Sequence, residues 1–278
     1  MKKTVISSCL LQSLLCLSGL QTAWPQEYNK IIQKTHSGKN TIGSEIYALA
    51  ILTYHNRTNT FLMMIKVSEI VKTESLYRVD RKDEDKLKQL LTECFREDPL
   101  YCQLIPKQEI RNKILPDIFS CDLDEMFENC EVYADSEDVN GIIVVSDESE
   151  PYNPIKYYAT EVFYALKTAV YLIKDDPSMQ TFINFMKGKS YLNSEWTEEI
   201  KQENRLHIIY FAVRPSMRGK GIASKMMSSV LEYADKNRMT TSLETHNVEN
   251  VHMYEHYGFK LFETVQKNFS LKQFCMVR

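Results

Sequence analysis

A turn rich in glycine and basic residues follows the apolar run 206–213 and precedes an amphipathic stretch of helical period. The turn contains Arg218, Gly219, Lys220 and Gly221. Glycine adopts positive φ angles and lets a ligand approach the backbone closely. The free N–H groups at the start of a helix carry partial positive charge, to which the two basic side chains add. The pattern therefore predicts a site for a phosphate or pyrophosphate group.

The spacing of the turn excludes two common phosphate loops. A P-loop needs four residues between its glycines and then Lys and Ser or Thr, and this spacing is absent. The dinucleotide fingerprint also fails, because Ser224 stands where a third glycine or alanine is expected. The pattern that fits is Arg-x-x-Gly-x-Ala, formed by Arg218, Gly221 and Ala223.

A second segment, 243–259, reads as a strand followed by a short helix that ends in Tyr-x-x-x-Gly-Phe. In this order and spacing, the two segments resemble the two signatures of the GNAT superfamily of N-acyltransferases. The Leu-Glu-Thr start at Leu243, together with Asn250 and Tyr254, is similar to a branch that includes puromycin N-acetyltransferase. The resemblance is clear over 205–263, weaker over 76–145, and absent before Met63.

The resemblance implies an α/β (α+β) fold of the GNAT type. Its mixed, mostly antiparallel sheet is splayed at the cofactor strand and flanked by helices. It also implies acetyl-CoA as co-substrate, with the pantetheine arm on backbone groups of the splayed strand and the pyrophosphate on the amides of the turn. The residues expected to bind it are Phe211, Ala212, Val213, Arg218, Gly219, Lys220, Gly221, Ile222, Ala223, Ser224 and Asn250.

Two residues are expected to move protons. Tyr254 matches the family's general acid, which protonates the departing thiolate. A phenol has a pKa near ~10, similar to that of an alkyl thiol, and proton transfer between groups of similar pKa is efficient. Glu244 is the candidate base for the attacking amine, directly or through a water. The alternatives are that Tyr254 is only a core aromatic and that Glu244 forms a structural salt bridge. His207 fits a satisfied core histidine better than a catalytic one.

The function implied is acetyl transfer to a primary amine by direct attack on the thioester. A catalytically silent acyl-CoA-binding module, or an acyltransferase that uses another acyl donor, stays open as an alternative. The acceptor is a small-molecule amine or a protein or peptide amine. A net charge of -3 and a pI near 6.1 give no global field for nucleic acid. No metal is expected, membrane association is disfavoured, and a homodimer is allowed.

The chain is expected to divide into an N-terminal extension, 1–62, and an acetyltransferase domain, 63–278. The extension has two lysines and then an apolar run from Val5 to Leu20, which resembles a secretory signal diluted by serines. The alternatives are a poorly ordered appendage and translated sequence upstream of a start at Met63 or Met64. Because acetyl-CoA is a cytosolic metabolite, we expect a cytoplasmic protein. The seven cysteines show no metal spacing and are expected to be reduced and mostly buried.

Hydrophobic periodicity predicts an alternation of strands and helices. Helices are expected over 83–96, 107–127 with a break near Pro116, 159–174, 179–187, 222–238 and 248–257. Strands are expected over 75–80, 131–135, 141–146, 206–213, 241–245, 259–265 and 271–277. The second and third strands are predicted to form a hairpin.

Overall fold

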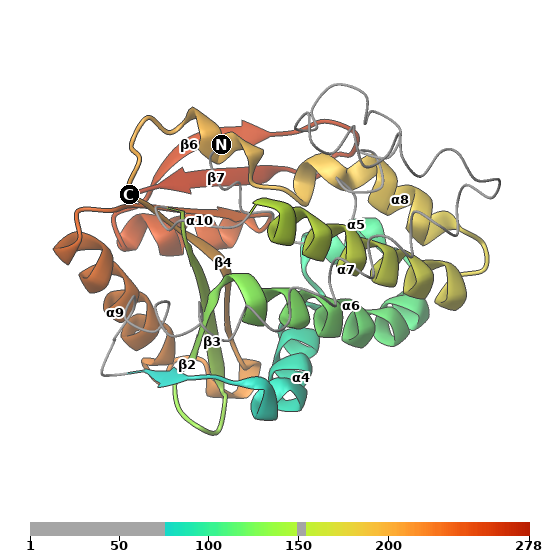
Figure 1. The fold of residues 1–278 in the computed structure, drawn as a ribbon, viewed down its shortest axis with the longest axis horizontal. Coiled ribbons are helices and arrows are strands. Elements are labelled where there is room, and N and C mark those ends of the chain that lie inside the picture. Colours follow the sequence, from blue (N-terminus) through green and yellow to red (C-terminus); the bar gives the residue numbers. More distant parts are fainter. Residues whose placement is uncertain (1–75, 149–153) are drawn as a thin grey trace.

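The computed structural model describes residues 76–148 and 154–278. These residues form a seven-stranded sheet in the order β1-β2-β3-β4-β5-β7-β6, in which only the β4–β5 pair is parallel. The observed architecture is the predicted mixed, mostly antiparallel sheet with helices on both faces (Figure 1). The predicted extension 1–62 lies outside the described residues.

The strands are β1 Tyr77–Arg78, β2 Glu131–Ala134, β3 Gly141–Asp147, β4 Arg205–Val213, β5 Thr240–Thr245, β6 Lys260–Val265 and β7 Gln273–Val277. The α-helices are α4 Glu84–Phe95, α5 Pro99–Leu104, α6 Gln108–Asn129, α7 Pro154–Asp175, α8 Gln180–Gly188, α9 Ile222–Lys236 and α10 Val248–His256. Short 3-10 turns are η2 Arg81–Asp83, η3 Lys189–Tyr191, η4 Glu195–Glu199 and η5 Pro215–Met217.

Each face of the sheet has its own hydrophobic core. Helices α4 to α8 pack on one face, called here the α4–α8 face, with buried residues such as Leu90, Ile118 and Phe185. Helices α9 and α10 cover the other, the α9–α10 face, with Met226 and Val230 among its buried residues. In Figure 1 the first group lies to the right and below, and the second to the left.

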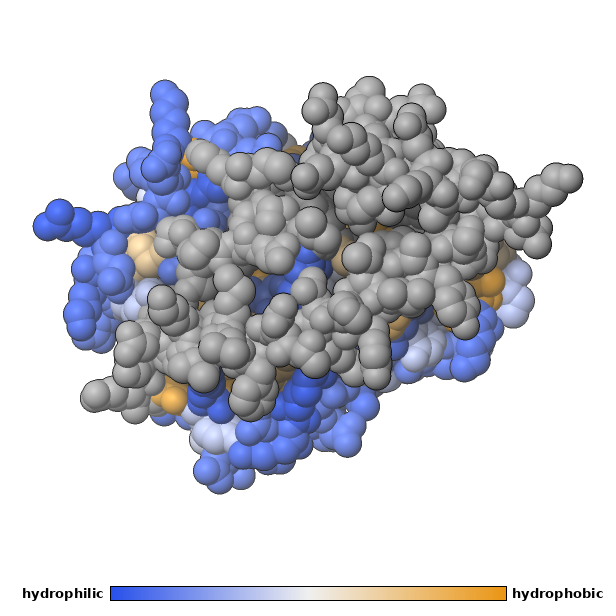
Figure 2. All heavy atoms as spheres, in the orientation of Figure 1, coloured by the Kyte–Doolittle hydropathy of each residue, from blue (hydrophilic) through white to orange (hydrophobic). Residues whose placement is uncertain are grey.

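The surfaces of the two helical groups differ. The outer side of α9 is hydrophilic, whereas apolar atoms appear at the right-hand edge, where α7 and α8 lie (Figure 2). Exposed apolar side chains on these helices include Phe163 and Val170 of α7 and Ile183 of α8. Among the described residues, no helix is both long and apolar enough to cross a membrane.

A β-bulge changes which face the side chains of β4 point to. Tyr210 pairs with Val144 and Ile208 with Val145, so Ile209 is an extra residue on β4. Ile208 packs in the core of the α9–α10 face, whereas Tyr210, two residues later, packs in the core of the α4–α8 face. A bulge re-aims side chains in this way because it interrupts the alternation of the strand by one residue.

Two helical segments differ from the sequence prediction. The break expected near Pro116 is wrong: α6 runs through this proline without interruption. Buried side chains on either side of it, including Ile114 and Ile118, hold the helix in the core at the cost of one backbone hydrogen bond. The unpredicted helix α5 starts with Pro99 at its first position and Asp98 as its N-cap, a local signal that the apolar period did not reveal.

The other predicted elements are confirmed with small changes of boundary, and the hairpin of β2 and β3 is present. The five cysteines in the described ranges are free thiols; Cys121 and Cys275 are buried, and the other three are half-buried. The prediction that most are buried therefore holds for only two of those that the structure describes.

Candidate active site

The two central strands separate at the predicted cofactor strand. The parallel pairing of β4 with β5 covers only Arg205–Ile208 and Thr240–Leu243. Beyond the bulge, the residues Phe211–Val213 pair with β3 on one side. In the described ranges no pairing with β5 is recorded for them, so the backbone groups predicted to hold the pantetheine arm face the gap between the strands.

The turn after β4 presents its backbone as predicted. Gly219 and Gly221 have φ angles of 77° and 79°, and a Cβ added at either would meet nothing within 4 Å. Gly221 is the N-cap of α9. In the described part of the chain, the amides of Gly219, Lys220 and Gly221 donate to no backbone carbonyl. Unpaired amides around open space beside a helix N-terminus suit an anionic group such as a pyrophosphate.

The basic side chains of the turn lie at its edges. The Arg218 guanidinium donates to the carbonyl of Val213 over 3.3 Å, which places it across the turn from the end of β4. The Lys220 ammonium lies 3.3 Å from Sδ of Met217. Neither side chain takes part in an ion pair in the described ranges, so both charges are available to an anion.

Helix α10 brings the two residues of the second signature to the same region. Its N-cap is Asn247, which accepts a hydrogen bond from the amide of Glu249. The half-buried Asn250 donates from its side-chain nitrogen to Oγ1 of Thr245 at 3.3 Å, and no described residue donates to its side-chain oxygen. Tyr254 follows one turn later and is 5% exposed.

The Tyr254 ring lies beside the gap between the strands. Its centroid is 6.4 Å from that of Phe211 and 5.9 Å from that of Phe259. Its hydroxyl makes no hydrogen bond that the structure records within the described ranges. Burial, aided by the negative charges of Asp98 and Glu244, raises the pKa of Tyr254 well above its usual value. The phenol is therefore protonated over the whole physiological pH range.

Glu244 lies on the α4–α8 face and is tied into a polar cluster. Its Oε1 accepts from Oγ of Ser194 at 2.7 Å, and its Oε2 accepts from Nε1 of Trp196 at 3.1 Å. The Nε2 of the fully buried His207 is 3.3 Å from Oε2, and its Nδ1 is 2.9 Å from Oγ of Ser242. Both carboxylate oxygens are therefore already engaged.

The charges of this cluster stabilise each other. Burial alone would raise the pKa of Glu244, but His207 and the hydrogen bonds from Ser194 and Trp196 lower it overall. Burial alone would lower the pKa of His207, but the Glu244 carboxylate raises it overall. Ser194 and Glu244 both contact Nε2 of His207. In the triad of a hydrolase, by contrast, the serine and the carboxylate contact opposite nitrogens of the imidazole.

Sequence reasoning missed several polar residues on the same face. The buried Tyr101, Asp122 and Tyr210 form a hydrogen-bonded group. His246, directly after β5, has a buried Nε2 without a partner, and burial lowers its pKa to about 4. Asp98 caps α5, and burial raises its pKa to about 6. The cap of α5 was the one local signal that could have revealed a member of this set.

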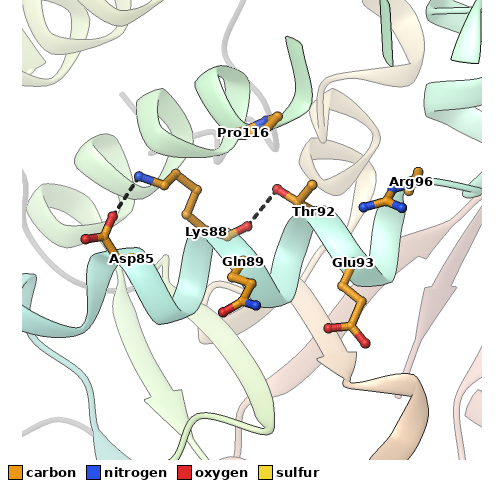
Figure 3. Close-up of a pocket in the computed structure, with 7 residues that line it drawn as sticks. All are labelled: Asp85, Lys88, Gln89, Thr92, Glu93, Arg96 and Pro116. Carbon is orange, nitrogen blue, oxygen red and sulfur yellow. Dashed lines mark hydrogen bonds and ion pairs between the residues drawn. The ribbon is translucent and has the colours of Figure 1, made fainter. Parts of the chain in front are cut away.

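A separate pocket of about 450 Å³ lies on α4 and reaches α6 at Pro116 (Figure 3). Its charged side chains are largely paired: Lys88 binds Asp85, and Glu93 forms an ion pair with Arg214. The pocket contains none of the predicted site residues. The candidate site is instead defined by the gap between β4 and β5, the turn and α10.

Over residues 142–259 the chain matches the family model described as the acetyltransferase (GNAT) family. This segment contains the splayed strand, the turn and α10. Residues 142–259 therefore carry a GNAT acetyltransferase domain, and the class of protein that this domain defines is an acyltransferase. In the comparison with curated proteins, none matches the chain.

Three solved structures of similar fold each cover 73% of this chain. One from Corynebacterium glutamicum, described as histone acetyltransferase HPA2 and related acetyltransferase, has 15% identity, a TM-score of 0.47 and 94% of its own chain covered. Arylalkylamine N-acetyltransferase 2 from Aedes aegypti has 12% identity, a TM-score of 0.44 and 97% covered. Arabidopsis thaliana Naa50, in complex with a bisubstrate analogue, has 18% identity, a TM-score of 0.38 and 97% covered. Because these TM-scores lie below 0.5, the family assignment rests on residues 142–259.

Proposed function

We propose that this protein transfers the acetyl group of acetyl-CoA to a primary amine by direct attack of the amine on the thioester. The observation that carries the proposal is the hydroxyl of Tyr254. It is protonated, lacks a recorded hydrogen-bond partner in the described ranges, and its ring lies 6.4 Å from that of Phe211 on the splayed strand. A silent binding module has no need of a proton donor at this point.

The chain's own groups suit the donor. Amides of residues 218–224 would hold the pyrophosphate, with Arg218 and Lys220 adding charge at its edges. Backbone groups of Phe211–Val213 would pair with the pantetheine arm as an additional strand would, because no described strand pairs with them on that side. The free carbonyl of Asn250 would accept from an amide of the same arm.

Proton transfer completes the reaction. As the amine nitrogen bonds to the carbonyl carbon, the carbon–sulfur bond breaks, and Oη of Tyr254 gives its proton to the departing sulfur. A backbone N–H at the bulge near Ile209 would stabilise the oxyanion. The sequence predicts Glu244 as the proton acceptor for the amine, but both of its carboxylate oxygens already accept hydrogen bonds, from Ser194 and Trp196.

The test uses the full chain in two steps. Calorimetry with acetyl-CoA and with dephospho-CoA measures donor binding; we expect micromolar affinity and weaker binding of dephospho-CoA. Release of CoA thiol is then followed with agmatine, tyramine and a short peptide with a free N-terminus, and with acetyl-, propionyl- and butyryl-CoA. Tight binding without transfer to any amine would indicate a silent module. Preference for propionyl- or butyryl-CoA would show that the acyl donor is not acetyl-CoA.

A further inference from the structure

Three buried polar side chains from different elements form a hydrogen-bonded line behind the splayed strand. The hydroxyls of Tyr101 in α5 and Tyr210 in β4 are 3.3 Å apart. Tyr210 in turn donates to Oδ2 of Asp122 in α6 at 2.8 Å. All three are almost completely buried, at 3%, 6% and 5% exposure. Burial of this carboxyl group costs free energy, because its one recorded hydrogen bond does not replace its hydration.

The β4 bulge explains why this line reaches the site. If β4 kept its regular alternation through Ile209, Tyr210 would share the α9–α10 face with Ile208 and point away from Asp122. The bulge puts Tyr210 on the α4–α8 face, and the residue that follows it, Phe211, is the first of the three expected to contact the pantetheine arm. The middle member of the line, Tyr210, therefore directly precedes the backbone that is expected to contact the pantetheine arm.

The Tyr101 end of the line and the proposed acid Tyr254 share a charged neighbour, Asp98. Asp98 interacts electrostatically with both Tyr101 and Tyr254. Its Oδ1 accepts from the amide of Leu100, and no partner is recorded for its Oδ2 in the described ranges. The charge of Asp98 therefore acts on both the proposed proton donor and the Tyr101 end of the line.

We propose that Tyr101, Tyr210 and Asp122 form a proton relay that accepts the proton of the attacking amine, a role that rests on the proposed acetyl transfer. The N–H bond breaks as a proton passes to Oη of Tyr101. The hydroxyl proton of Tyr101 passes to Oη of Tyr210, and that of Tyr210 passes to Oδ2 of Asp122. Asp122 gains one proton while Tyr254 gives one to the sulfur, and exchange with solvent restores both after product release.

The electrostatic surroundings fit a proton acceptor that works near neutral pH. Burial raises the pKa of Asp122 to about 7, and the hydrogen bond from Tyr210 opposes this only in part. The groups that face Asp122 are Tyr210 from β4, Tyr101 from α5 and Cys121 on α6 itself, with Asp98 beyond Tyr101. From α7, Lys167 pairs instead with Asp124. No described cation pairs with Asp122 to keep it ionised at low pH.

Asp122→Asn tests the relay, because an amide keeps the shape but cannot accept the proton. We expect kcat/KM for the best amine of the three to fall about 100-fold at pH 7.5, in the range of general base catalysis. We also expect the rise of wild-type kcat/KM through about pH 7 to disappear, with acetyl-CoA affinity unchanged. Asp124→Asn, on the same helix but in surface ion pairs with Arg81 and Lys167, is the matched control and should keep both rate and profile.

Tyr210→Phe keeps the ring packed against Phe95 and Phe119 and removes only the hydroxyl, so it guards against a folding defect in Asp122→Asn. It should also abolish the rise of kcat/KM through about pH 7. The relay is overturned if this rise persists in both variants. It is also overturned if the rise disappears in Glu244→Gln or Asp98→Asn but not in Asp122→Asn. A wild-type protein that acetylates no amine would refute the proposed function itself, which is a different result.

Discussion

In the proposed reaction the α9–α10 face holds the donor and the α4–α8 face the acceptor, and the two faces differ in how their polar groups are held. On the α9–α10 face the proposed donor site consists of backbone amides, two glycines and one tyrosine hydroxyl for which the described ranges record no partner. On the α4–α8 face the polar side chains bind each other: within the described residues Glu244 has three partners, and Tyr210 has two. Open backbone groups suit one fixed ligand, whereas a network of side chains can be changed to suit different acceptors.

The largest expected effect concerns the donor side. Gly221→Asp should lower acetyl-CoA affinity about 100-fold or more, which is about 2.8 kcal/mol. Because an added Cβ meets nothing within 4 Å, the cause is not a clash with the protein. The causes are a positive φ of 79° and a negative charge beside the pyrophosphate.

The companion variant Gly221→Ala separates these two causes. It carries the backbone strain, roughly 1–2 kcal/mol, without the charge. We expect it to lower the melting temperature and to keep most of the acetyl-CoA affinity by calorimetry. Wild-type affinity in Gly221→Asp would refute the phosphate site.

Tyr254→Phe should lower kcat about 100-fold at pH 7.5 and leave the Kd of acetyl-CoA nearly unchanged. The ring contacts with Phe211 and Phe259 remain, and only the proton donor is lost. Calorimetry and a thiol-release assay on the same sample measure both quantities. An unchanged kcat would show that another group protonates the thiolate.

Glu244→Gln tests the acceptor side of this comparison through its effect on the stability of the fold. The lowered pKa of Glu244 stabilises the fold above its ordinary value of 4.5, and this contribution is lost as the pH falls. The raised pKa of His207 stabilises the fold below 6.5, and this contribution is lost as the pH rises through the folded value. The pair therefore contributes most between these values.

We expect Glu244→Gln to lower the free energy of unfolding by about 1–3 kcal/mol at pH 5.5 and by less at pH 8.5. Urea denaturation at the two pH values measures the difference. A large loss of kcat without any loss of stability would instead support the predicted role of Glu244 as base.

The smallest effect is expected at Lys220. Its ammonium is exposed and would contribute only a screened charge to the donor site. Lys220→Ala should weaken acetyl-CoA binding by about two- to fivefold at low salt and by less at 0.5 M salt. Titration at two salt concentrations checks this, and an effect independent of salt would indicate a direct, buried contact.

The residues proposed for the donor side could be chosen from the sequence because they are close together in the chain. Arg218 to Ser224 and Asn250 to Tyr254 belong to two short motifs, and local backbone geometry is enough to place each of them. The same local rules gave most helices and strands. They failed at Pro116, where burial of the flanking helix outweighs the missing hydrogen bond.

The sequence alone therefore determined the class of domain, the glycine turn and the proposed acid. Only the tertiary structure showed that Tyr101, Asp122 and Tyr210 meet, because they come from three elements and have no characteristic spacing. It alone also showed that Glu244 is engaged by His207, Ser194 and Trp196. A single bulge residue, Ile209, decides on which face Tyr210 lies, and a strand pattern cannot reveal it because the apolar run of β4 is buried on both faces.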